Sequence, residues 1–396
     1  MKMAERKKVL ILGGGFGGIK AALELAGHPS FAVTLLSDQE NFRYYPMLYR
    51  TATGGKQMAS QIPLSEIFAG KELQLVKDSA LSLDRQTKKV GTQSGKTYNY
   101  DSLIVALGVV TNFFDIKGLS EYAYGIKTQE ESRRFRDHLH KVLIKDQKPD
   151  INYVVIGGGP TGVELAGALP GYIRHIMHRH NLDVRPIHVD LVEAQARLVP
   201  RMPVRYSRAI AKRLRSLGVS LHLNEKVLAE TVDELKVTGH SITSHSVVWT
   251  AGVTNHPFLK DNDFPLSEEG RTVVDTYLQT EPNVYVIGDN ANTPYTGMAQ
   301  TALYDGKFVA ENLKRQAANK QLQTYKPKKP IYITPVGPHW AAVLWGNSQI
   351  YGWFGWLLRN LADFAGYHDY EPWWKAGKRL RSTFDTEETC PVCVDK

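Results

Sequence analysis

The chain of 396 residues contains two cysteines, Cys390 and Cys393, and both lie within its last seven residues. A fold held by disulfides is therefore excluded, and so is catalysis by a pair of cysteines in the core. No apolar run approaches the roughly 20 residues that a membrane-spanning helix requires. The apolar stretch at residues 9–12 runs directly into glycines and is too short for the core of a signal peptide. We expect a cytoplasmic protein whose contact with a membrane, if it has one, is peripheral.

Acidic residues are outnumbered, because 40 Asp and Glu stand against 49 Lys and Arg, for a formal net charge of +9. Such an excess suits either a nucleic acid or an anionic membrane surface. The chain carries no recognisable nucleic-acid-binding module, so we expect no nucleic-acid partner and favour the membrane surface. A hydrophobic share of 42% is ordinary for a globular protein, and the length allows two or three domains.

Two glycine loops begin 144 residues apart, at Gly13 and Gly157, and each follows a short β-branched run and opens into an apparent helix. Both have the spacing G-x-G-x-x-G. The first glycine allows a tight turn, the second lets the backbone approach a pyrophosphate, and the third lets the helix pack on the strand. The phosphates then meet the positive end of the helix. A single loop of this kind is often an ordinary turn, but two of them predict a duplicated dinucleotide-binding unit. The residues of the two loops are Gly13, Gly15, Phe16, Gly17 and Gly18, and Gly157, Gly159, Pro160, Thr161 and Gly162.

The strand after each loop is expected to end in an acid that binds the adenosine ribose. After the first loop the expected position is Ser37, and we expect Asp38, one residue later, to serve. After the second loop the acid is Glu193, 36 residues beyond Gly157, because the intervening helix continues to about residue 180. Glu193 accepts both ribose hydroxyls of NAD and repels a 2′-phosphate, which favours NADH over NADPH, whereas the nearby Arg197 argues the other way.

Further motifs follow in a fixed order, and together with the loops they resemble the two-dinucleotide flavoprotein superfamily. Within it, the chain resembles the type II NADH dehydrogenases, which are single-subunit NADH:quinone oxidoreductases. The stretches that carry the resemblance are 105–114 (VALGVVTNFF), 157–167 (GGGPTGVELAG), 249–253 (WTAGV), 287–289 (IGD) and 299–302 (AQTA).

The resemblance implies an α/β fold with two Rossmann-like dinucleotide-binding domains and a C-terminal membrane-associating region. It implies a discontinuous FAD domain at 1–114 and 255–325, an NADH domain at 115–254, and a membrane-docking or dimerisation region at 326–396. The implied activity is oxidation of NADH through FAD, with reduction of menaquinone or ubiquinone in the respiratory chain and without proton pumping. Besides the first loop, Ser37 and Asp38, the implied FAD residues are Ala106, Gly108, Asp289, Ala299 and Gln300. Besides the second loop and Glu193, the implied NADH residues are Glu164, Ala251 and Gly252.

Three residues are implied in catalysis. Glu164 lies near the nicotinamide–flavin junction in the family and assists proton movement there, although a carboxylate at a helix N-terminus also has a purely structural use. Gln300 faces the quinone side of the flavin. The family pattern has two further glutamines in this segment, and this chain has Tyr304 and Asp305 instead. Tyr304 is a candidate donor to a quinone oxygen.

The C-terminal part holds six of the seven tryptophans, between Trp340 and Trp374. Residues 351–365 predict a helix with a wide apolar face and with Arg359, Asn360 and Asp363 opposite, too short to span a bilayer but suited to its surface. The basic run 378–381 adds cations for anionic lipid. We therefore favour docking at the cytoplasmic face of the cell membrane, against packing on the protein's own core or a dimer interface, and we expect a homodimer.

The tail pair Cys390 and Cys393 has the spacing of half a zinc site or of a redox pair, and a metal shared between two subunits is its one metal-binding interpretation. We expect no other metal site. Three alternatives to the quinone reductase remain. One is a sulfide:quinone or disulfide reductase, against which the missing core cysteines argue. The second is a soluble NAD(P)H-dependent flavin reductase that passes electrons to a small redox protein. The third is a nucleotide-sensing flavoprotein without turnover.

Overall fold

The computed structural model describes residues 6–144, 152–183 and 186–386, and the chain divides into two compact units. Unit 1 comprises Met1–Phe42, Ile62–Val110 and Thr254–Pro330. Unit 2 comprises Arg43–Gln61, Thr111–Val253 and Ile331–Lys396. The C-terminal segment thus belongs to the same unit as the second glycine loop. The functional division into FAD, NADH and membrane-docking domains stays a prediction.

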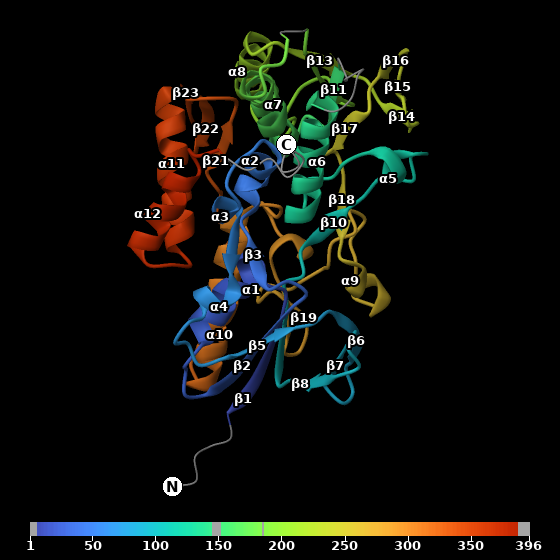
Figure 1. Ribbon diagram of the computed structural model, residues 1–396. Coiled ribbons are helices and arrows are strands. Elements are labelled where there is room, and N and C mark those ends of the chain that lie inside the picture. Colours follow the sequence, from blue (N-terminus) through green and yellow to red (C-terminus); the bar gives the residue numbers. More distant parts are fainter. Residues whose placement is uncertain (1–5, 145–151, 184–185, 387–396) are drawn as a thin grey trace. The chain divides into compact units, whose positions relative to one another are not determined.

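Unit 1 is built on a six-stranded sheet in the order β19-β20-β9-β1-β2-β5, parallel except for the antiparallel edge pair β19 and β20 (Figure 1). Its central strands are runs of Val, Ile and Leu, as expected for strands that are covered on both faces. The strands are β1 (Lys7–Leu12), β2 (Phe31–Ser37), β5 (Gln74–Lys77), β9 (Ser102–Val105), β19 (Gln279–Glu281) and β20 (Val284–Val286).

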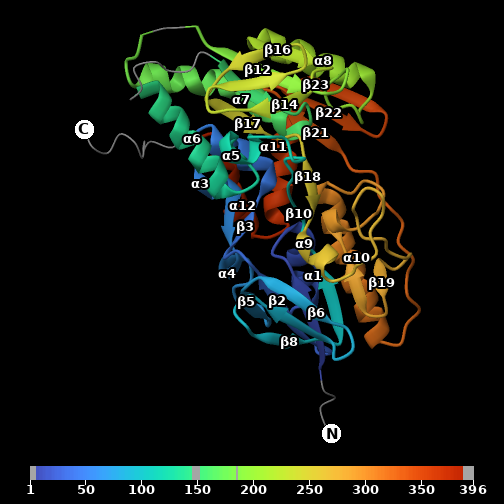
Figure 2. The ribbon, with the colours of Figure 1, turned by 90° about the vertical axis from the view of Figure 1, so that its right-hand side faces the viewer.

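The helices of unit 1 include α1 (Phe16–Leu25) and α10 (Ala299–Ala317), which lie side by side in both views (Figures 1 and 2). Their backbones approach closely, because a Cβ on Gly306 would lie 2.3 Å from the carbonyl oxygen of Gly17. The shorter helices are α4 (Leu64–Ile67), α9 (Pro257–Asp261) and the 3-10 turn η2 (Gly288–Asn290).

Residues 73–100 form an antiparallel meander over only part of their length. It consists of β6 (Ala80–Asp84), β7 (Lys89–Thr92) and β8 (Thr97–Asn99). The first part of the stretch, β5, instead pairs in parallel with β2, from Thr34 opposite Gln74 to Ser37 opposite Lys77. This pairing covers backbone groups of β2 that would otherwise form an open sheet edge.

Unit 2 contains a four-stranded parallel sheet in the order β13-β12-β11-β17 and a small antiparallel sheet β14-β15-β16. The parallel strands are β11 (Asn152–Ile156), β12 (His188–Glu193), β13 (Val219–Leu223) and β17 (Ser246–Trp249). The antiparallel strands are β14 (Val227–Glu230), β15 (Glu234–Val237) and β16 (His240–Thr243).

Helices α6 (Gln129–Ile144), α7 (Pro160–Arg179) and α8 (Val204–Ser216) bury apolar faces in unit 2. The C-terminal segment adds the sheet β21 (Tyr332–Pro335), β22 (Ala341–Trp345) and β23 (Ser348–Gly352), followed by α11 (Trp353–His368) and α12 (Trp373–Ser382). The segment 43–61 contributes the 3-10 turn η1 (Tyr45–Met47), α2 (Leu48–Ala52) and α3 (Gln57–Ser60), and α5 (Leu119–Tyr122) completes the unit. The chain passes between the units at β3 (Asn41–Arg43), β4 (Gln61–Pro63), β10 (Val109–Thr111) and β18 (Val253–Asn255).

The two parallel sheets repeat one arrangement. In unit 1, β1 lies between β9 and β2, and in unit 2, β11 lies between β17 and β12. In both, the strand that precedes the glycine loop is therefore at the point where the strand order reverses. That is where α/β sheets bind ligands, at the carboxyl ends of the strands. The expected α/β class with two Rossmann-like units is confirmed.

Candidate functional sites at the glycine loops and helix α11

The glycine loop of unit 1 joins β1 to α1 with very little space. Gly13 has φ +110°, and a Cβ there would lie 2.2 Å from the carbonyl oxygen of Ala106. A Cβ on Gly18 would lie 2.0 Å from the carbonyl oxygen of Gly13. Any side chain at either position would push the helix away from the strand, so both glycines are structurally required.

The loop of unit 2 repeats this geometry. Gly157 also has φ +110°, and a Cβ there would lie 2.8 Å from the Cα of Ala251. A Cβ on Gly162 would lie 1.9 Å from the carbonyl oxygen of Gly157. Pro160 is the first residue of α7, where its missing N–H costs no hydrogen bond, and Thr161 follows it half-buried.

The middle glycines show what the loops can bind. A Cβ on Gly15 or on Gly159 would meet no atom within 4 Å, so each faces open space. Both residues are the N-caps of their helices, α1 and α7, and neither helix has a side-chain cap. The first N–H groups of a helix lack intrahelical partners, and the helix dipole places positive charge there. Each loop therefore fits a pyrophosphate.

The second strand of unit 2 brings Glu193 back to its glycine loop. The Glu193 Oε2 accepts a hydrogen bond of 2.6 Å from the backbone N–H of Gly158, and Oε1 accepts one of 2.7 Å from that of Gln195. These bonds hold the carboxylate beside the loop, where the ribose of a bound dinucleotide is expected.

The equivalent position in unit 1 is held by Ser37, because Gly13 N–H donates to Leu36 O as Gly157 N–H donates to Val192 O. Ser37 is buried, and its hydroxyl lies where a Cβ on Gly14 would meet it at 2.6 Å. Asp38 is exposed, and its carboxylate accepts from the side chain of Gln39 at 3.1 Å. The role expected for Asp38 stays a prediction.

In the sequence, Arg197 was a reason to consider NADPH. In the structure, its guanidinium donates hydrogen bonds to other groups of unit 2. Its guanidinium donates to the carbonyl oxygen of Met202 at 2.5 Å, to the hydroxyl of Ser207 at 2.9 Å, and to the carbonyl oxygen of Pro200. A guanidinium committed to these acceptors is not directed at a 2′-phosphate beside Glu193. The argument for NADH is therefore stronger in the structure than in the sequence.

Asn290 is a residue of unit 1 that the sequence analysis missed. It is fully buried, accepts from Gly108 N–H at 2.8 Å and donates to Gly108 O at 2.6 Å. It thereby ties the end of the strand that carries Ala106 and Gly108 to the turn that carries Asp289, which is half-buried. The residue follows the Ile-Gly-Asp motif directly, and this adjacency was the available signal.

At residues 304–305 the chain departs from the family pattern of two further glutamines, and the structure explains the second of these residues, Asp305. Asp305 is fully buried, and it accepts from the Tyr325 hydroxyl at 2.6 Å and from the Gly288 N–H at 3.0 Å. Burial raises its pKa from 3.8 to about 6, against the opposing effect of these two donors. Asp305 therefore joins α10 to the turn after β20, and its side chain is committed to the interior of unit 1.

The proposed quinone-side residues lie on the first part of α10. Ala299 begins the helix half-buried, and Gln300 is exposed. Tyr304 is half-buried, with its ring 5.6 Å from that of Tyr325 and with the Lys328 ammonium 4.4 Å from the ring centre. Its function as a donor to a quinone stays a prediction.

The remaining loop residues are placed by close packing. In unit 1, the ring of Phe16 lies edge-on to that of Phe42 at 4.9 Å. A Cβ on Gly17 would lie 3.1 Å from the carbonyl oxygen of Ala302 in α10. In unit 2, Ala251 is exposed, and a Cβ on Gly252 would lie 2.4 Å from the ring of Phe114.

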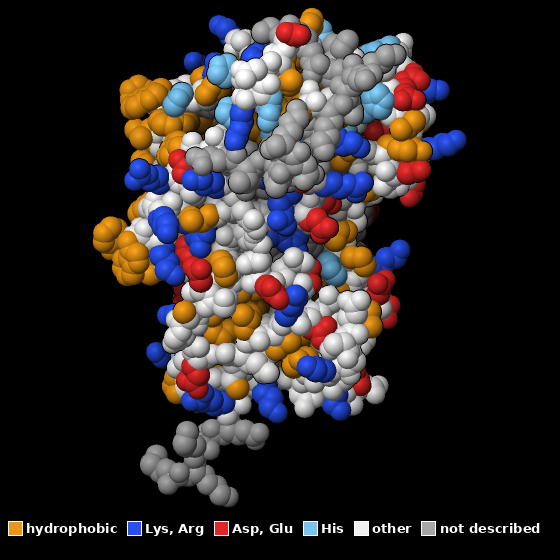
Figure 3. All heavy atoms as spheres, in the orientation of Figure 1, with side chains coloured by type: hydrophobic (Ala, Val, Ile, Leu, Met, Phe, Trp, Pro, Cys, Tyr) orange, Lys and Arg blue, Asp and Glu red, His pale blue; other side chains and the backbone are white. Residues whose placement is uncertain are grey.

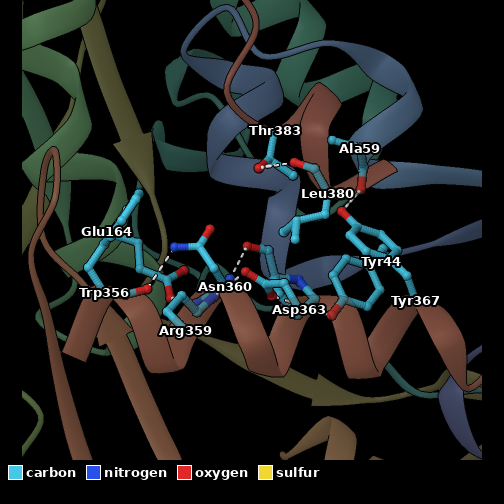
Figure 4. Close-up of polar contacts among 11 residues, drawn as sticks. Tyr44, Ala59, Glu164, Trp356, Arg359, Asn360, Asp363, Tyr367, Leu380 and Thr383 are labelled. Atoms are coloured by element: carbon cyan, nitrogen blue, oxygen red, sulfur yellow. Dashed lines mark hydrogen bonds and ion pairs between the residues drawn. The ribbon is translucent and has the colours of Figure 1, made fainter. Parts of the chain in front are cut away.

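Glu164, in the first turns of α7, belongs to a buried ionic group with Arg359, which is 195 residues away in the sequence (Figure 4). Its Oε1 lies 3.4 Å from Nη1 of Arg359, which α11 directs into unit 2. The Arg359 Nε donates to Oδ2 of Asp363 at 2.7 Å, and Nη2 donates to Pro46 O at 2.9 Å. The Asp363 Oδ1 lies 3.4 Å from the hydroxyl of Tyr44.

Burial favours the protonated form of Glu164 near neutral pH. Burial raises its pKa from 4.5 to about 7, against the opposing attraction of Arg359 and with a smaller contribution from Asp363. Burial also raises the pKa of Asp363. One guanidinium cannot neutralise two carboxylates, and its shorter contact is with Asp363. Glu164 is therefore the acid that keeps its proton to the higher pH.

Helix α11 is oriented with its charged residues inward. Arg359 and Asp363 are buried together with Gly355 and Tyr367, so one buried stripe repeats every four residues. Several apolar side chains on the other sides are exposed: Trp353 by 54%, Phe354 by 67% and Leu361 by 57%, whereas Trp356, Leu358 and Phe364 are half-buried. The helix thus packs on unit 2 through its charged stripe and leaves part of its apolar face exposed, and the use of that face stays a prediction.

The prediction that the basic run 378–381 provides cations for lipid is wrong for one of its residues, Arg379, which lies in α12. Arg379 is buried, forms a double ion pair with Glu371, and donates to the carbonyl oxygens of Met58 and Gln61 at 2.8 and 3.0 Å. It is therefore a structural residue and is not available to lipid. The exposed cations of the run are Lys378 and Arg381.

Exposed aromatic and aliphatic side chains gather over α11 and α12 (Figure 3). We call this set the apolar surface of unit 2; it comprises Trp353, Phe354, Leu357, Leu361, Trp373 and Trp374. Within the described part of the chain, no helix has both the length and the apolar character needed to cross a bilayer. The cysteine pair of the tail lies outside the described residues.

Two glycine-loop units, each with an open helix N-terminus, define a protein of the class that binds two dinucleotides. Residues 7–306 match the model of the pyridine nucleotide-disulphide oxidoreductases, and the chain belongs to that family.

Curated relatives narrow the comparison. The chain is 28% identical to the type II NADH:quinone oxidoreductase Ndh of Mycobacterium tuberculosis, over 91% of this chain and 85% of that protein. It is also 28% identical to the type II NADH:quinone oxidoreductase of Staphylococcus aureus strain NCTC 8325, over 85% of this chain and 89% of that protein. The fold is similar to that of NDH2 from Plasmodium falciparum in complex with NADH, with a TM-score of 0.86 and 17% identity over 96% of this chain and 98% of that one. The resemblance to type II NADH dehydrogenases is confirmed.

Proposed function

We propose that this chain is an FAD-dependent NADH:quinone oxidoreductase that works at a membrane surface without pumping protons. The observation that carries the proposal is the pair of matching glycine loops, of which the second has Glu193 held beside it by the Gly158 N–H. The curated relatives, which are named for NADH and quinone, favour a quinone as acceptor over a small redox protein and favour turnover over sensing. FAD bound at the first loop would supply the two-electron redox chemistry between the nicotinamide and the quinone.

FAD is assigned to unit 1. Gly13, Gly15 and Gly18 hold its pyrophosphate at the N-terminus of α1, while Ser37 and Asp38 lie at the ribose end. Ala106, Gly108 and Asp289 line the strand ends that Asn290 ties together. Ala299 and Gln300 begin α10. The dipole of this helix favours negative charge on a bound ligand at its N-terminus, and no acidic residue in the first turn opposes this.

NADH is assigned to unit 2, at Gly157, Gly159, Pro160, Thr161 and Gly162, with Ala251 and Gly252 on the adjacent strand end. Glu193 binds the two ribose hydroxyls and repels the phosphate of NADPH. The engagement of Arg197 with the carbonyl oxygens of Pro200 and Met202 supports this preference.

Glu164 is assigned to proton handling. Reduction of a quinone to a quinol takes two electrons and two protons, and the hydride of NADH supplies both electrons and one of the protons, so one further proton is taken up from water. A carboxyl whose pKa is about 7 changes its protonation state readily at neutral pH. A Glu164→Gln variant cannot transfer this proton and is expected to slow quinone reduction most below about pH 7, where wild-type Glu164 is protonated. Wild-type turnover at every pH would contradict this assignment.

Membrane attachment is assigned to the apolar surface of unit 2. Tryptophans at an apolar surface with flanking Lys378 and Arg381 suit the boundary between headgroups and acyl chains. Docking there gives a lipid-soluble quinone direct access to the enzyme, and we place it at the cytoplasmic face. A dimer interface is the competing use of the same surface, since a homodimer is also expected.

Vesicle sedimentation separates the two uses. The double variant Trp373→Ser, Trp374→Ser is expected to weaken binding to anionic vesicles by about tenfold or more and to leave the sedimentation coefficient in buffer unchanged. Leu81→Ser, which removes a side chain exposed by 64% in the β6–β8 meander, is the control and keeps vesicle binding. Unchanged vesicle binding together with a smaller sedimentation coefficient in the tryptophan variant would assign the surface to dimerisation.

The activity is tested by steady-state oxidation of NADH and NADPH with menaquinone and ubiquinone analogues, with and without liposomes. We expect purified protein to be yellow, to bleach with NADH, and to regain its colour when a quinone is added. Protein without flavin would refute the proposal. Rapid reoxidation by a small iron–sulfur protein but not by a quinone would favour the soluble reductase.

A further inference from the structure

A compact cluster of metal-ligand side chains lies in unit 2 outside the residues assigned above. It consists of His222 on β13, Glu225 in the turn that follows, and His240 at the start of β16. Their ligand atoms all lie within 4.8 Å of one another, and among the described residues this is the one such group of three or more His, Cys, Asp or Glu side chains. The His222 Nδ1 is 3.6 Å from Glu225 Oε1, and the His240 Nδ1 is 3.6 Å from Glu225 Oε2.

The two separations of 3.6 Å are close to those between the ligand atoms of a tetrahedral ion. Zinc binds nitrogen and oxygen at about 2.0–2.1 Å, so neighbouring ligand atoms in a tetrahedron are about 3.4 Å apart. The Glu225 Oε2 is buried and has no hydrogen-bond partner among the described residues. A buried carboxylate oxygen without a partner is costly, and a cation between it and the two imidazoles would satisfy it.

The surroundings of His222 also suit a metal. Its Nε2 lies 3.0 Å from Oδ1 of Asp190, a residue of β12 that is 7% exposed. A ring that donates from Nε2 to Asp190 would direct the lone pair of Nδ1, the atom near Glu225, at a bound ion. A carboxylate behind the far nitrogen of a ligating histidine is the usual support of a metal site.

We propose that His222, Glu225 and His240 bind a divalent ion of the zinc class, with water as the fourth ligand. The side chain of His240 is 42% exposed, which leaves the ion an entry path and an open position. Two imidazoles and one carboxylate are ligands that zinc, copper and nickel prefer over magnesium or calcium. The ion would join β13 of the parallel sheet to β16 of the small antiparallel sheet.

The test is calorimetric titration of chelator-treated, tag-free full-length protein with zinc chloride. Cys390 and Cys393 are replaced by serine throughout, because a C-x-x-C pair is itself a zinc ligand. Thermal unfolding with and without zinc is measured on the same samples, followed by tryptophan fluorescence. X-ray absorption of the zinc-loaded protein reads the ligand type directly.

We expect binding of a single ion and imidazole scattering in the absorption spectrum, and zinc should raise the unfolding temperature. His240→Ala should weaken binding by more than about tenfold, and Glu225→Gln should also weaken it. His245→Ala is the matched control, since His245 is an exposed histidine of unit 2 that pairs with Asp233 at 2.9 Å and is not in the cluster. Absence of saturable binding, or equal affinity in His240→Ala and His245→Ala, would overturn the proposal.

Discussion

The protonation of Glu164 can be tested by its effect on stability, with Glu164→Gln as the perturbation. Glutamine has the shape of the protonated acid but cannot ionise. Between pH 4.5 and about 7, the native chain holds a proton on Glu164 that the unfolded chain has already lost. The free energy of unfolding of the wild type therefore falls as the pH rises through this range, and the variant escapes this loss.

The magnitude follows from the raised pKa. The change from 4.5 to about 7, at 1.36 kcal/mol per unit, makes the ionised side chain cost the native state about 3 kcal/mol above pH 7. We expect the free energy of unfolding of Glu164→Gln, relative to that of the wild type, to increase by about 2–3 kcal/mol between pH 5 and pH 8. Asp363 titrates in both proteins, so its contribution largely cancels in the difference.

The assay is urea unfolding followed by tryptophan fluorescence. All seven tryptophans lie in the stretches of unit 2, so the signal reports on the unit that contains Glu164. Glu130→Gln, which removes an exposed carboxylate from the first turn of α6, is the control and should stay within about 0.5 kcal/mol of the wild type at both pH values. Infrared spectroscopy adds a direct readout, because a protonated carboxyl band at pH 6 should be missing from the variant.

If the difference in free energy of unfolding between Glu164→Gln and the wild type were the same at pH 5 and pH 8, the reasoning would be refuted. Such a result would mean that the Arg359 guanidinium keeps Glu164 ionised, and that Glu164 is a structural ion-pair partner only.

Three other substitutions test the remaining sites. Arg359→Met leaves two buried carboxylates without a cation. It should destabilise unit 2 by about 3–5 kcal/mol at pH 8, and by less at pH 5, where both acids gain protons. Equal losses of stability at the two pH values, measured by fluorescence-monitored unfolding, would contradict this. Tyr325→Phe removes the donor to Asp305 and should cost about 1.5–3 kcal/mol in unfolding followed by circular dichroism, whereas no loss would show that the bond is not needed. Glu193→Ala should raise KM for NADH by roughly 10–100-fold with little change in kcat, because the variant loses charged hydrogen bonds to the ribose. An unchanged KM in steady-state kinetics would mean that the ribose binds elsewhere.

Both glycine loops, and most strands and helices around them, could be predicted because their causes are local. A Cβ on Gly18 or Gly162 would lie only 2.0 or 1.9 Å from the carbonyl oxygen of the first glycine of its own loop, and that requirement is visible in the sequence. Glu193 could be found in the same way, since it ends the strand that follows the loop. The length of α7 was also predictable, and it accounts for the long gap between Gly157 and Glu193.

Residues far apart in the chain came together only through tertiary packing. Arg359 and Glu164 are 195 residues apart, and Asn290 and Gly108 are 182 apart, so no local pattern pairs them. The pairing of β5 with β2 was missed for the same reason, because a short strand does not reveal which sheet edge it will cover.

For helix α11, the sequence determined which residues share a face, and the tertiary structure determined which face is buried. The sequence by itself determined that the helix has an apolar face and a charged stripe, since that follows from the spacing of its residues. Which face turns inward was decided by the tertiary structure, because Glu164 and the Pro46 carbonyl lie beneath α11 and receive Arg359. Burying the charged stripe against these partners leaves Trp353, Phe354 and Leu361 exposed, and this exposure is the basis for placing the protein at a membrane.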